Sequence, residues 1–292
     1  MVKGLYTAYT GMINEQHRMD VLTNNLANAN TNGYKKEGAT SQSFSDQLAL
    51  KIKDITDAPF TARGLGIINP GVKIGEGYVD WSEGPMKETG NTFDVAINGD
   101  GFFAIEHTNK AVNIQRDTAG NTEVMYTRDG NFTLKYEDGE SYLTTQDGDY
   151  VLDESGGHIS IDPNRPVTIN TQGQIYQPQM DASGQPMVGV QEDLMGTIGV
   201  YDFEKTIYPD GRISYDNLEH YAENLYVPVD AEAEQSTNYA VYAGFLEQSN
   251  VSVVDEMVQM IAVQRNYDTN QKMITTIDET LDIAANQLGR LS

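Results

Sequence analysis

The four histidines are the first residues at which this chain could do chemistry. His17, His107, His158 and His220 lie far apart and show no metal-ligand spacing such as His-x-x-x-His. His17 also falls on the polar side of a helix that the N-terminal sequence predicts. We therefore expect no catalytic residue and no metal ligand among the histidines.

A glycine-rich segment, GDGFFAIE at residues 99–106, invites comparison with phosphate-binding loops. It lacks the fuller dinucleotide-binding pattern and is not followed by a helix. The chain also has no Gly-x-Ser-x-Gly elbow. We interpret the segment as a tight turn between strands, and we expect no cofactor and no enzymatic activity.

Acidic turns in the middle of the chain suggest calcium as an alternative. Aspartates stand at 129, 138, 147 and 149, so the first three are nine residues apart. An EF-hand needs oxygen ligands at alternate positions within one loop, whereas Asp-Gly is a preferred turn pair. Turns are therefore favoured over a calcium site. A glycan-binding face on Tyr-rich strands is the other alternative, and it is weakened because Trp81 is the single tryptophan.

Charge and composition narrow the class of protein. The chain has 292 residues and a formal net charge of −24, concentrated between residues 41 and 243. Such an acidic surface argues against nucleic-acid binding, which needs basic residues to meet phosphates. There is no cysteine, which excludes disulfides and thiolate metal sites. No apolar run has signal-peptide or membrane-span length, so we expect no stable membrane insertion, and export without a cleaved signal stays open.

The N-terminal segment has the periodicity of an amphipathic helix. Its apolar residues recur at heptad spacing, which predicts a helix with one packed face. Asn32-Gly33 is expected to end it, because this pair favours left-handed backbone and turns. The expected face contains Leu5, Tyr9, Met12, Met19, Leu22, Asn25, Leu26 and Asn28.

The C-terminal segment carries a matching stripe. We expect its helix to begin near Ser249-Asn250 or Ser252, with Asp255 and Glu256 in the first turn. The two terminal helices are predicted to pack on each other as a coiled coil and to pack further against other copies. The expected face contains Val253, Met260, Tyr267, Ile274, Ile277, Leu281 and Leu288.

Between the helices the pattern is β. Short segments rich in β-branched and aromatic residues alternate with turn pairs over residues 93–239, which predicts an antiparallel meander of hairpins. Residues 44–55 could instead extend a helix. The expected class is α+β, with long terminal helices and an inserted, mainly antiparallel all-β domain. The expected domains are 1–40 (helix), 41–92 (extended linker or variable segment), 93–243 (β-rich) and 244–292 (helix).

Asparagines crowd the end of the first helix, in NNLANANTNGYKK at residues 24–36. Asn25 and Asn28 flank the apolar stripe on a helical wheel. A side-chain amide both donates and accepts hydrogen bonds, and buried amides fix helix register. We hypothesise that these two residues specify how neighbouring subunits dock.

The terminal motifs resemble those of bacterial flagellar axial proteins. GLYTA at residues 4–8, NNLANANTNGYK at 24–35 and LEQSNVSVVDEMVQMIAVQRNY within 246–281 match the family's signatures at both ends. In the middle, DVAINGDGFFAI (94–105), YTRDGNFTL (126–134) and ENLYVP (223–228) resemble the β-domain of the basal-body rod proteins. Length favours the rod over the hook protein, which usually carries a larger inserted domain.

The resemblance implies a structural function. It implies a subunit of the flagellar basal-body rod, exported by the flagellar type III apparatus and located outside the cytoplasmic membrane. It also implies a helical homopolymer that contacts other rod and hook axial proteins and transmits torque from motor to hook. The sequence leaves the choice between proximal and distal rod open. The runner-up is a β-scaffold surface protein that binds glycan or calcium and has coiled-coil termini.

Overall fold

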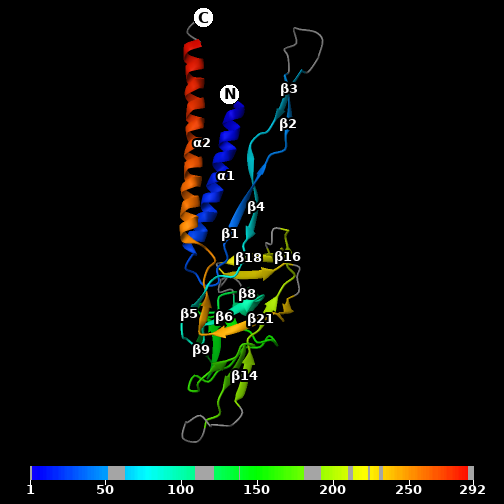
Figure 1. Cartoon of the computed structure of the whole chain (residues 1–292), viewed down its shortest axis with the longest axis vertical. Helices are drawn as coiled ribbons and strands as arrows, with labels where there is room; N and C mark the ends of the chain where they lie inside the picture. Colours follow the sequence, from blue (N-terminus) through cyan, green and yellow to red (C-terminus); the bar gives the residue numbers. More distant parts are fainter. Residues whose placement is uncertain are drawn as a thin grey trace, which may run out of the picture. The chain divides into compact units, whose positions relative to one another are not determined.

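The computed structural model describes residues 2–51, 63–108, 122–137, 139–180, 192–209, 213–222, 224–229 and 233–288. The chain divides into two compact units (Figure 1). The first comprises Met1–Ala27, Glu37–Val79 and Ser252–Ser292, and the second comprises Asn28–Lys36 and Asp80–Val251. The class is α+β, as the sequence predicts.

Two long helices dominate the first unit. They are α1 (Val2–Ala27) and α2 (Val253–Leu288), which lie side by side and run in opposite directions (Figure 1). The predicted start of α2 at Ser252 is confirmed, because Asp255 N donates to Ser252 Oγ at 3.4 Å and Glu256 N donates to Ser252 O at 3.0 Å. Ser252 is therefore the N-cap of α2, followed by two acidic residues that favour the positive end of the helix.

Two antiparallel strand pairs complete the first unit. β1 (Glu37–Ser43) pairs with β4 (Val72–Val79), and β2 (Gln47–Lys51) pairs with β3 (Arg63–Ile68). The prediction that residues 44–55 extend a helix is wrong for the described part of that segment. Backbone groups of β2 pair with β3 from Gln47 opposite Ile68 onward, and this long-range partner overrides the local helical spacing.

The second unit is built of strands, and its described strand pairs are all antiparallel. Its main sheet has the order β18-β19-β8-β7-β11-β10-β9, with β15 joining β7 to β20. Smaller sheets are β12-β13-β14, β16-β17, β21-β6 and β22-β5. The strands are β5 (Met86–Glu88), β6 (Val95–Gly99), β7 (Phe102–Thr108), β8 (Thr122–Thr127), β9 (Phe132–Glu137), β10 (Glu140–Thr145), β11 (Tyr150–Val151), β12 (Thr168–Ile169), β13 (Gln174–Gln177), β14 (Asp193–Thr197), β15 (Val200–Asp202), β16 (Thr206–Ile207), β17 (Ile213–Ser214), β18 (Leu218–Ala222), β19 (Leu225–Pro228), β20 (Glu234–Gln235), β21 (Tyr239–Ala243) and β22 (Phe245–Glu247).

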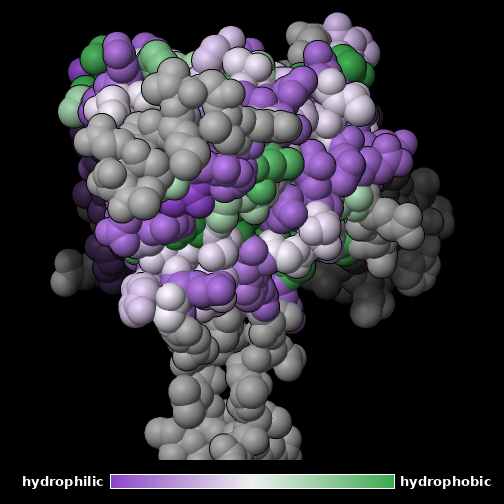
Figure 2. All heavy atoms as spheres, turned by 90° about the horizontal axis from the view of Figure 1, so that it is seen from below, coloured by the Kyte–Doolittle hydropathy of each residue, from purple (hydrophilic) through white to green (hydrophobic). Residues whose placement is uncertain are grey.

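Strand β7 is central because both of its faces are buried. Phe103 packs in an apolar cluster with residues such as Val95 and Phe132. Phe102 faces a second, aromatic cluster around Trp81, whose ring centroid is 5.4 Å away. This double burial explains the continuous apolar run of the segment, which an alternating half-buried strand would not show. The face of the molecule in Figure 2 is instead mostly hydrophilic, with small hydrophobic patches.

The predicted meander is correct at some turns and wrong at two others. At residues 99–101 the chain turns between β6 and β7, but these strands do not pair, because β6 pairs with β21. Gly139 follows β9 in a hairpin to β10, and Gly148 turns the chain from β10 to β11. At Asp129-Gly130, however, β8 and β9 do not pair. Gly130 instead lies against Val95, whose N donates to Gly130 O at 2.9 Å, and a Cβ there would meet Val95 O. Close backbone approach, which no spacing reveals, requires this glycine.

Candidate assembly site

Small and polar residues of α1 lie where it contacts α2. A Cβ on Gly4 would lie 3.5 Å from Ile277 Cδ1, and a Cβ on Gly11 would lie 3.0 Å from Asn270 Nδ2. Near the other end of α1, Asn25 Nδ2 donates to Glu256 Oε2 at 3.3 Å. Glycine inside a helix costs about 1 kcal/mol relative to alanine. The close contact at Gly11 gives this glycine a packing role that offsets the cost, whereas a Cβ on Gly4 would make an ordinary van der Waals contact.

Most of the predicted stripe residues are half-buried in the structure. Leu22 and Asn25 of α1 are buried, and Tyr9 is exposed. Val253 is exposed at the start of α2, and the side chain of Leu288 lies outside the described residues. The half-buried members are Leu5, Met12, Met19, Leu26 and Asn28 from the N-terminal set and Met260, Tyr267, Ile274, Ile277 and Leu281 from the C-terminal set.

Asn25 uses its amide within its own chain. Its Nδ2 donates to Glu37 O at 2.8 Å, and its Oδ1 accepts from Glu37 N at 2.9 Å. Together with the bond to Glu256, these contacts join α1, the start of β1 and the first turn of α2. The side chain is fully buried. Removing the amide would leave several buried polar groups unsatisfied.

The remaining motif residues belong to the second unit. The first helix ends earlier than predicted, because α1 stops at Ala27 and not at Asn32-Gly33. Asn28 therefore lies in a turn, where its O accepts from Thr31 N at 3.1 Å. Asn32 O accepts from Asn224 Nδ2 at 2.6 Å. Gly33 has φ 67, and its N donates to Glu247 O at 2.8 Å. A side chain at this position would meet the backbone of Arg128. Gly33 therefore meets two needs of the fold, left-handed backbone and close packing.

A buried ion-pair cluster ties the two terminal motifs together, and sequence reasoning did not single it out. Lys35 Nζ lies 2.7 Å from Glu247 Oε1, and Arg128 Nη1 lies 3.3 Å from Glu247 Oε2. Lys35 Nζ also donates to Ser82 O, and Gly84 N donates to Glu247 Oε1. Burial lowers the pKa of Lys35 from its usual value, while the Glu247 carboxylate opposes that shift. The sequence signal that could have indicated this cluster is that Lys35 and Glu247 belong to motifs near opposite ends of the chain.

Both helices expose groups of apolar residues that, apart from Tyr9, the predicted stripes omit. On α2, Val254, Met257, Val258 and Ile261 are exposed at spacings of three, four and seven. On α1, Tyr6, Tyr9 and Ile13 are exposed at similar spacing. At 3.6 residues per turn, each group lies on the side of its helix away from the other helix. We call these residues the outer faces of α1 and α2. The sequence signal for these outer faces was a second series of apolar residues at helical spacing in each segment.

The described residues contain neither a metal-binding group nor a membrane-spanning helix. Within them, no group of three or more histidine, aspartate or glutamate side chains is arranged to hold a metal ion. His107 and His158 each pair with one carboxylate, Asp149 and Glu106 respectively. No helix in the described ranges is long and apolar enough to cross a membrane.

Comparison with known proteins matches the chain in three places. The family "Flagella basal body rod protein" matches residues 5–35, the family "Flagellar hook protein FlgE/F/G D1 domain" matches 96–177, and "Flagellar basal body rod FlgEFG protein C-terminal" matches 242–288.

Full-length relatives agree with these matches. The flagellar basal-body rod protein FlgG of Bacillus subtilis is 34% identical, covering 98% of this chain and 99% of its own. The rod protein FlgF of Caulobacter vibrioides is 30% identical, covering 100% of both chains. The flagellar hook-basal body complex protein FlhO of B. subtilis is 28% identical, again over 100% of both.

Fold and relatives together define a structural, non-enzymatic subunit of the bacterial flagellum. The chain belongs to the flagellar basal-body rod protein family, and its place in the cell is the basal-body rod. Neither the described residues nor the relatives support the glycan- or calcium-binding alternative.

Proposed function

We propose that the chain polymerises with copies of itself and with other axial proteins through the outer faces of α1 and α2. The observation that carries this proposal is the pair of exposed apolar faces, with Val254 69% and Tyr6 61% exposed. Apolar residues grouped on one face usually mark an interaction site. Identical subunits joined by two different helix faces form open helical assemblies when the rotation does not close.

Coiled-coil packing of α1 with α2 is the second part of the proposal. The stripe residues, including Met12, Met260 and Ile274, would order the two helices against each other, and the outer faces would then contact neighbours. Under this proposal, the predicted assembly residues hold the two helices together so that the outer faces are formed, and they also contact other subunits. Heptad spacing of the α2 stripe and the contacts of Gly4 and Gly11 support it.

Export and torque form the third part. We propose that the subunit leaves the cell through the flagellar type III apparatus and that the polymer transmits torque from motor to hook. Close packing between long helices resists shear without covalent links. The division into residues 1–40, 41–92, 93–243 and 244–292 remains a proposal about which segments enter the tube core and which stay outside.

Charge placed on one outer face tests the proposal. The variant Met257→Glu/Ile261→Glu puts two carboxylates on the outer face of α2. It should abolish polymers seen by electron microscopy and sedimentation of the purified protein. Because both side chains are exposed, the free energy of unfolding should change by less than about 0.5 kcal/mol per site.

Gln259→Glu is the matched control. Gln259 is exposed on the same helix but lies off the outer face, so this variant should assemble like the wild type. Normal filaments from the double variant would refute the proposal. Equal loss in the control would show that added charge, and not the face, matters.

A further inference from the structure

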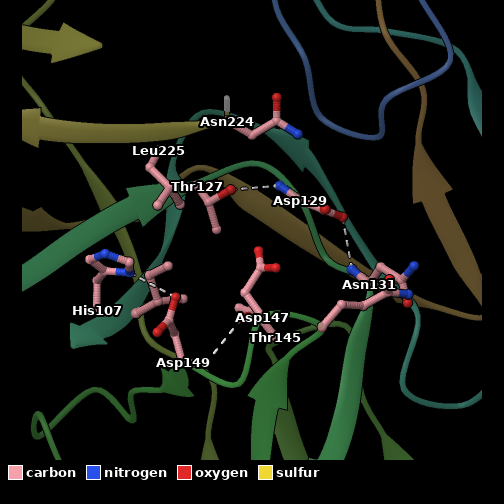
Figure 3. A pocket seen from close by; sticks show the side chains of 11 residues that line it. His107, Thr127, Asp129, Asn131, Thr145, Asp147, Asp149, Asn224 and Leu225 are labelled. Atoms are coloured by element: carbon pink, nitrogen blue, oxygen red, sulfur yellow. Dashed lines mark hydrogen bonds and ion pairs between the residues drawn. The ribbon is translucent and has the colours of Figure 1, made fainter. Parts of the chain in front are cut away.

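A pocket of about 320 Å³ lies in the second unit, and none of its lining residues takes part in the proposed function. Its walls come from β7, the segment after β8, the turn between β10 and β11, and the start of β19. Figure 3 shows the Asp147 side chain pointing into the space between Asp129 and Asp149. Three carboxylates therefore share one small space.

Asp129 and Asp149 are held in place by their neighbours. Asn131 N donates to Asp129 Oδ1 at 3.0 Å, and Asp129 N donates to Thr127 Oγ1 at 3.0 Å. Asp149 N donates to Thr145 Oγ1 at 3.2 Å. These contacts fix the backbone and the carboxylate of Asp129, so the acidic wall is built before any ligand arrives.

Two buried oxygens in the walls have unused hydrogen-bonding capacity. The side chain of Asp149 is only 4% exposed and pairs with His107 Nδ1 through Oδ2 at 2.9 Å. Its Oδ1 has no hydrogen-bond partner among the described residues, and the same holds for Asn224 Oδ1. Buried acceptors without partners are rare in native proteins and need an explanation. Because both unused atoms are acceptors, a ligand that satisfies them must be a donor.

Size and lining select the kind of donor. A bare metal ion would be small for this volume. Among the described residues, no group of three or more histidine, aspartate or glutamate side chains is arranged to hold one. Ile105 and Leu225 supply apolar wall beside the aspartates. Acidic atoms at one side and aliphatic atoms at another suit a nitrogen cation carried on a hydrocarbon chain.

We propose that this pocket binds one guanidinium or alkylammonium group, with Asp147 and Asp129 as its anionic contacts. An arginine or lysine side chain of another polypeptide and a free small amine share this chemistry. The site rests on the pocket, the three carboxylates and the buried acceptors, so it stands or falls independently of polymerisation.

Agmatine, a guanidinium on a four-carbon amine chain, is the probe. Isothermal titration calorimetry with the full chain should show saturable binding. Asp147→Asn should weaken it by about tenfold, because it removes one charge-assisted contact. Asp147 is exposed in a turn, and Asn-Gly suits such a turn as well as Asp-Gly, so the variant should fold. Glu234→Gln removes an exposed charge outside the pocket and should leave binding unchanged.

Further arms separate the sources and the alternatives. If saturating agmatine and Asp147→Asn both block assembly, the occupant is a basic side chain of another subunit. If assembly is unaffected by either, it is a free amine. The proposal is overturned by absent agmatine binding, by equal binding to Asp147→Asn and wild type, or by displacement of agmatine by equimolar calcium at constant ionic strength.

Discussion

Lys35 Nζ and Glu247 Oε1 lie 2.7 Å apart, with side chains only 2% and 1% exposed, although 212 positions separate them in the chain. Arg128 adds a second cation to the same carboxylate at 3.3 Å. The pair joins the asparagine-rich N-terminal motif to the segment that precedes α2. Some residues of the terminal motifs are therefore buried and stabilise the second unit from inside.

Glu247→Gln should unfold the second unit at lower denaturant. The substitution keeps the size but leaves Lys35 and Arg128 buried without their anion, which costs about 3–5 kcal/mol. Fluorescence of Trp81, buried in the same unit, reports the urea transition. Glu234→Gln should leave the midpoint unchanged. A loss below about 1 kcal/mol for Glu247→Gln would show that water compensates the cations.

Gly33→Ala should cost more stability than Gly90→Ala. The two glycines have similar left-handed conformations, φ 67 and φ 73. Nothing lies within 4 Å of a Cβ on Gly90, so that variant bears only the conformational cost of about 1–2 kcal/mol. A Cβ on Gly33 would lie 2.5 Å from the carbonyl carbon of Arg128. Overpacking should add about 1–3 kcal/mol, measured by urea denaturation. Equal losses would mean that the backbone moves aside freely.

Asn25→Leu should destabilise the first unit before any assembly. It leaves both backbone groups of Glu37 without their partner, at a cost of about 3 kcal/mol in total. Amide exchange of α1 and α2 in the dilute monomer measures this loss. Asn30→Leu, at an exposed site in the same motif, is the control and should leave exchange unchanged. If amide exchange is unaltered in Asn25→Leu, Asn25 does not stabilise the first unit, and docking between subunits is left as its role.

Asp129→Asn should change the pH dependence of stability. Burial first, and then the charges of Asp147 and Asp94, raise the pKa of Asp129 to about 6 from an ordinary value of 3.8. Between these values the folded state holds a proton that the unfolded state has lost, so stability falls as pH rises from about 4 to 6.

The variant removes this penalty because an amide does not ionise. Relative to wild type, it should be about 1–2 kcal/mol more stable at pH ~7.5 than at pH ~4. Urea midpoints across that range, compared with Asp216→Asn at an exposed site, give the difference. Parallel pH curves for wild type and Asp129→Asn would contradict the raised pKa.

Local signals predicted the helices and much of the β-rich unit. Heptad spacing and the Ser252 cap locate α2, because both depend on residues within a few positions of one another. The same logic failed for residues 44–55, where β3 supplies hydrogen-bond partners from a distance. It also failed at Gly130, whose role comes from contact with Val95.

The candidate site was predictable only in outline. Sequence spacing identified one stripe per helix, but it gave no reason to separate the residues between the helices from outer residues such as Met257. Which periodicity is buried depends on the partner helix, which approaches α1 at Gly4 and Gly11. The pocket likewise gathers Asp129, Asp147 and Asn224 from separate turns.

By itself, the sequence determined the class of fold, the two amphipathic helices and the acidic middle, because composition and short-range periodicity encode them. It also carried the resemblance to axial proteins, because that rests on contiguous motifs. Only the tertiary structure decided that Asn25 bonds within its own chain, that Lys35 meets Glu247, and which apolar face remains exposed. Those facts depend on pairs far apart in the chain, and their geometry exists only after the elements pack.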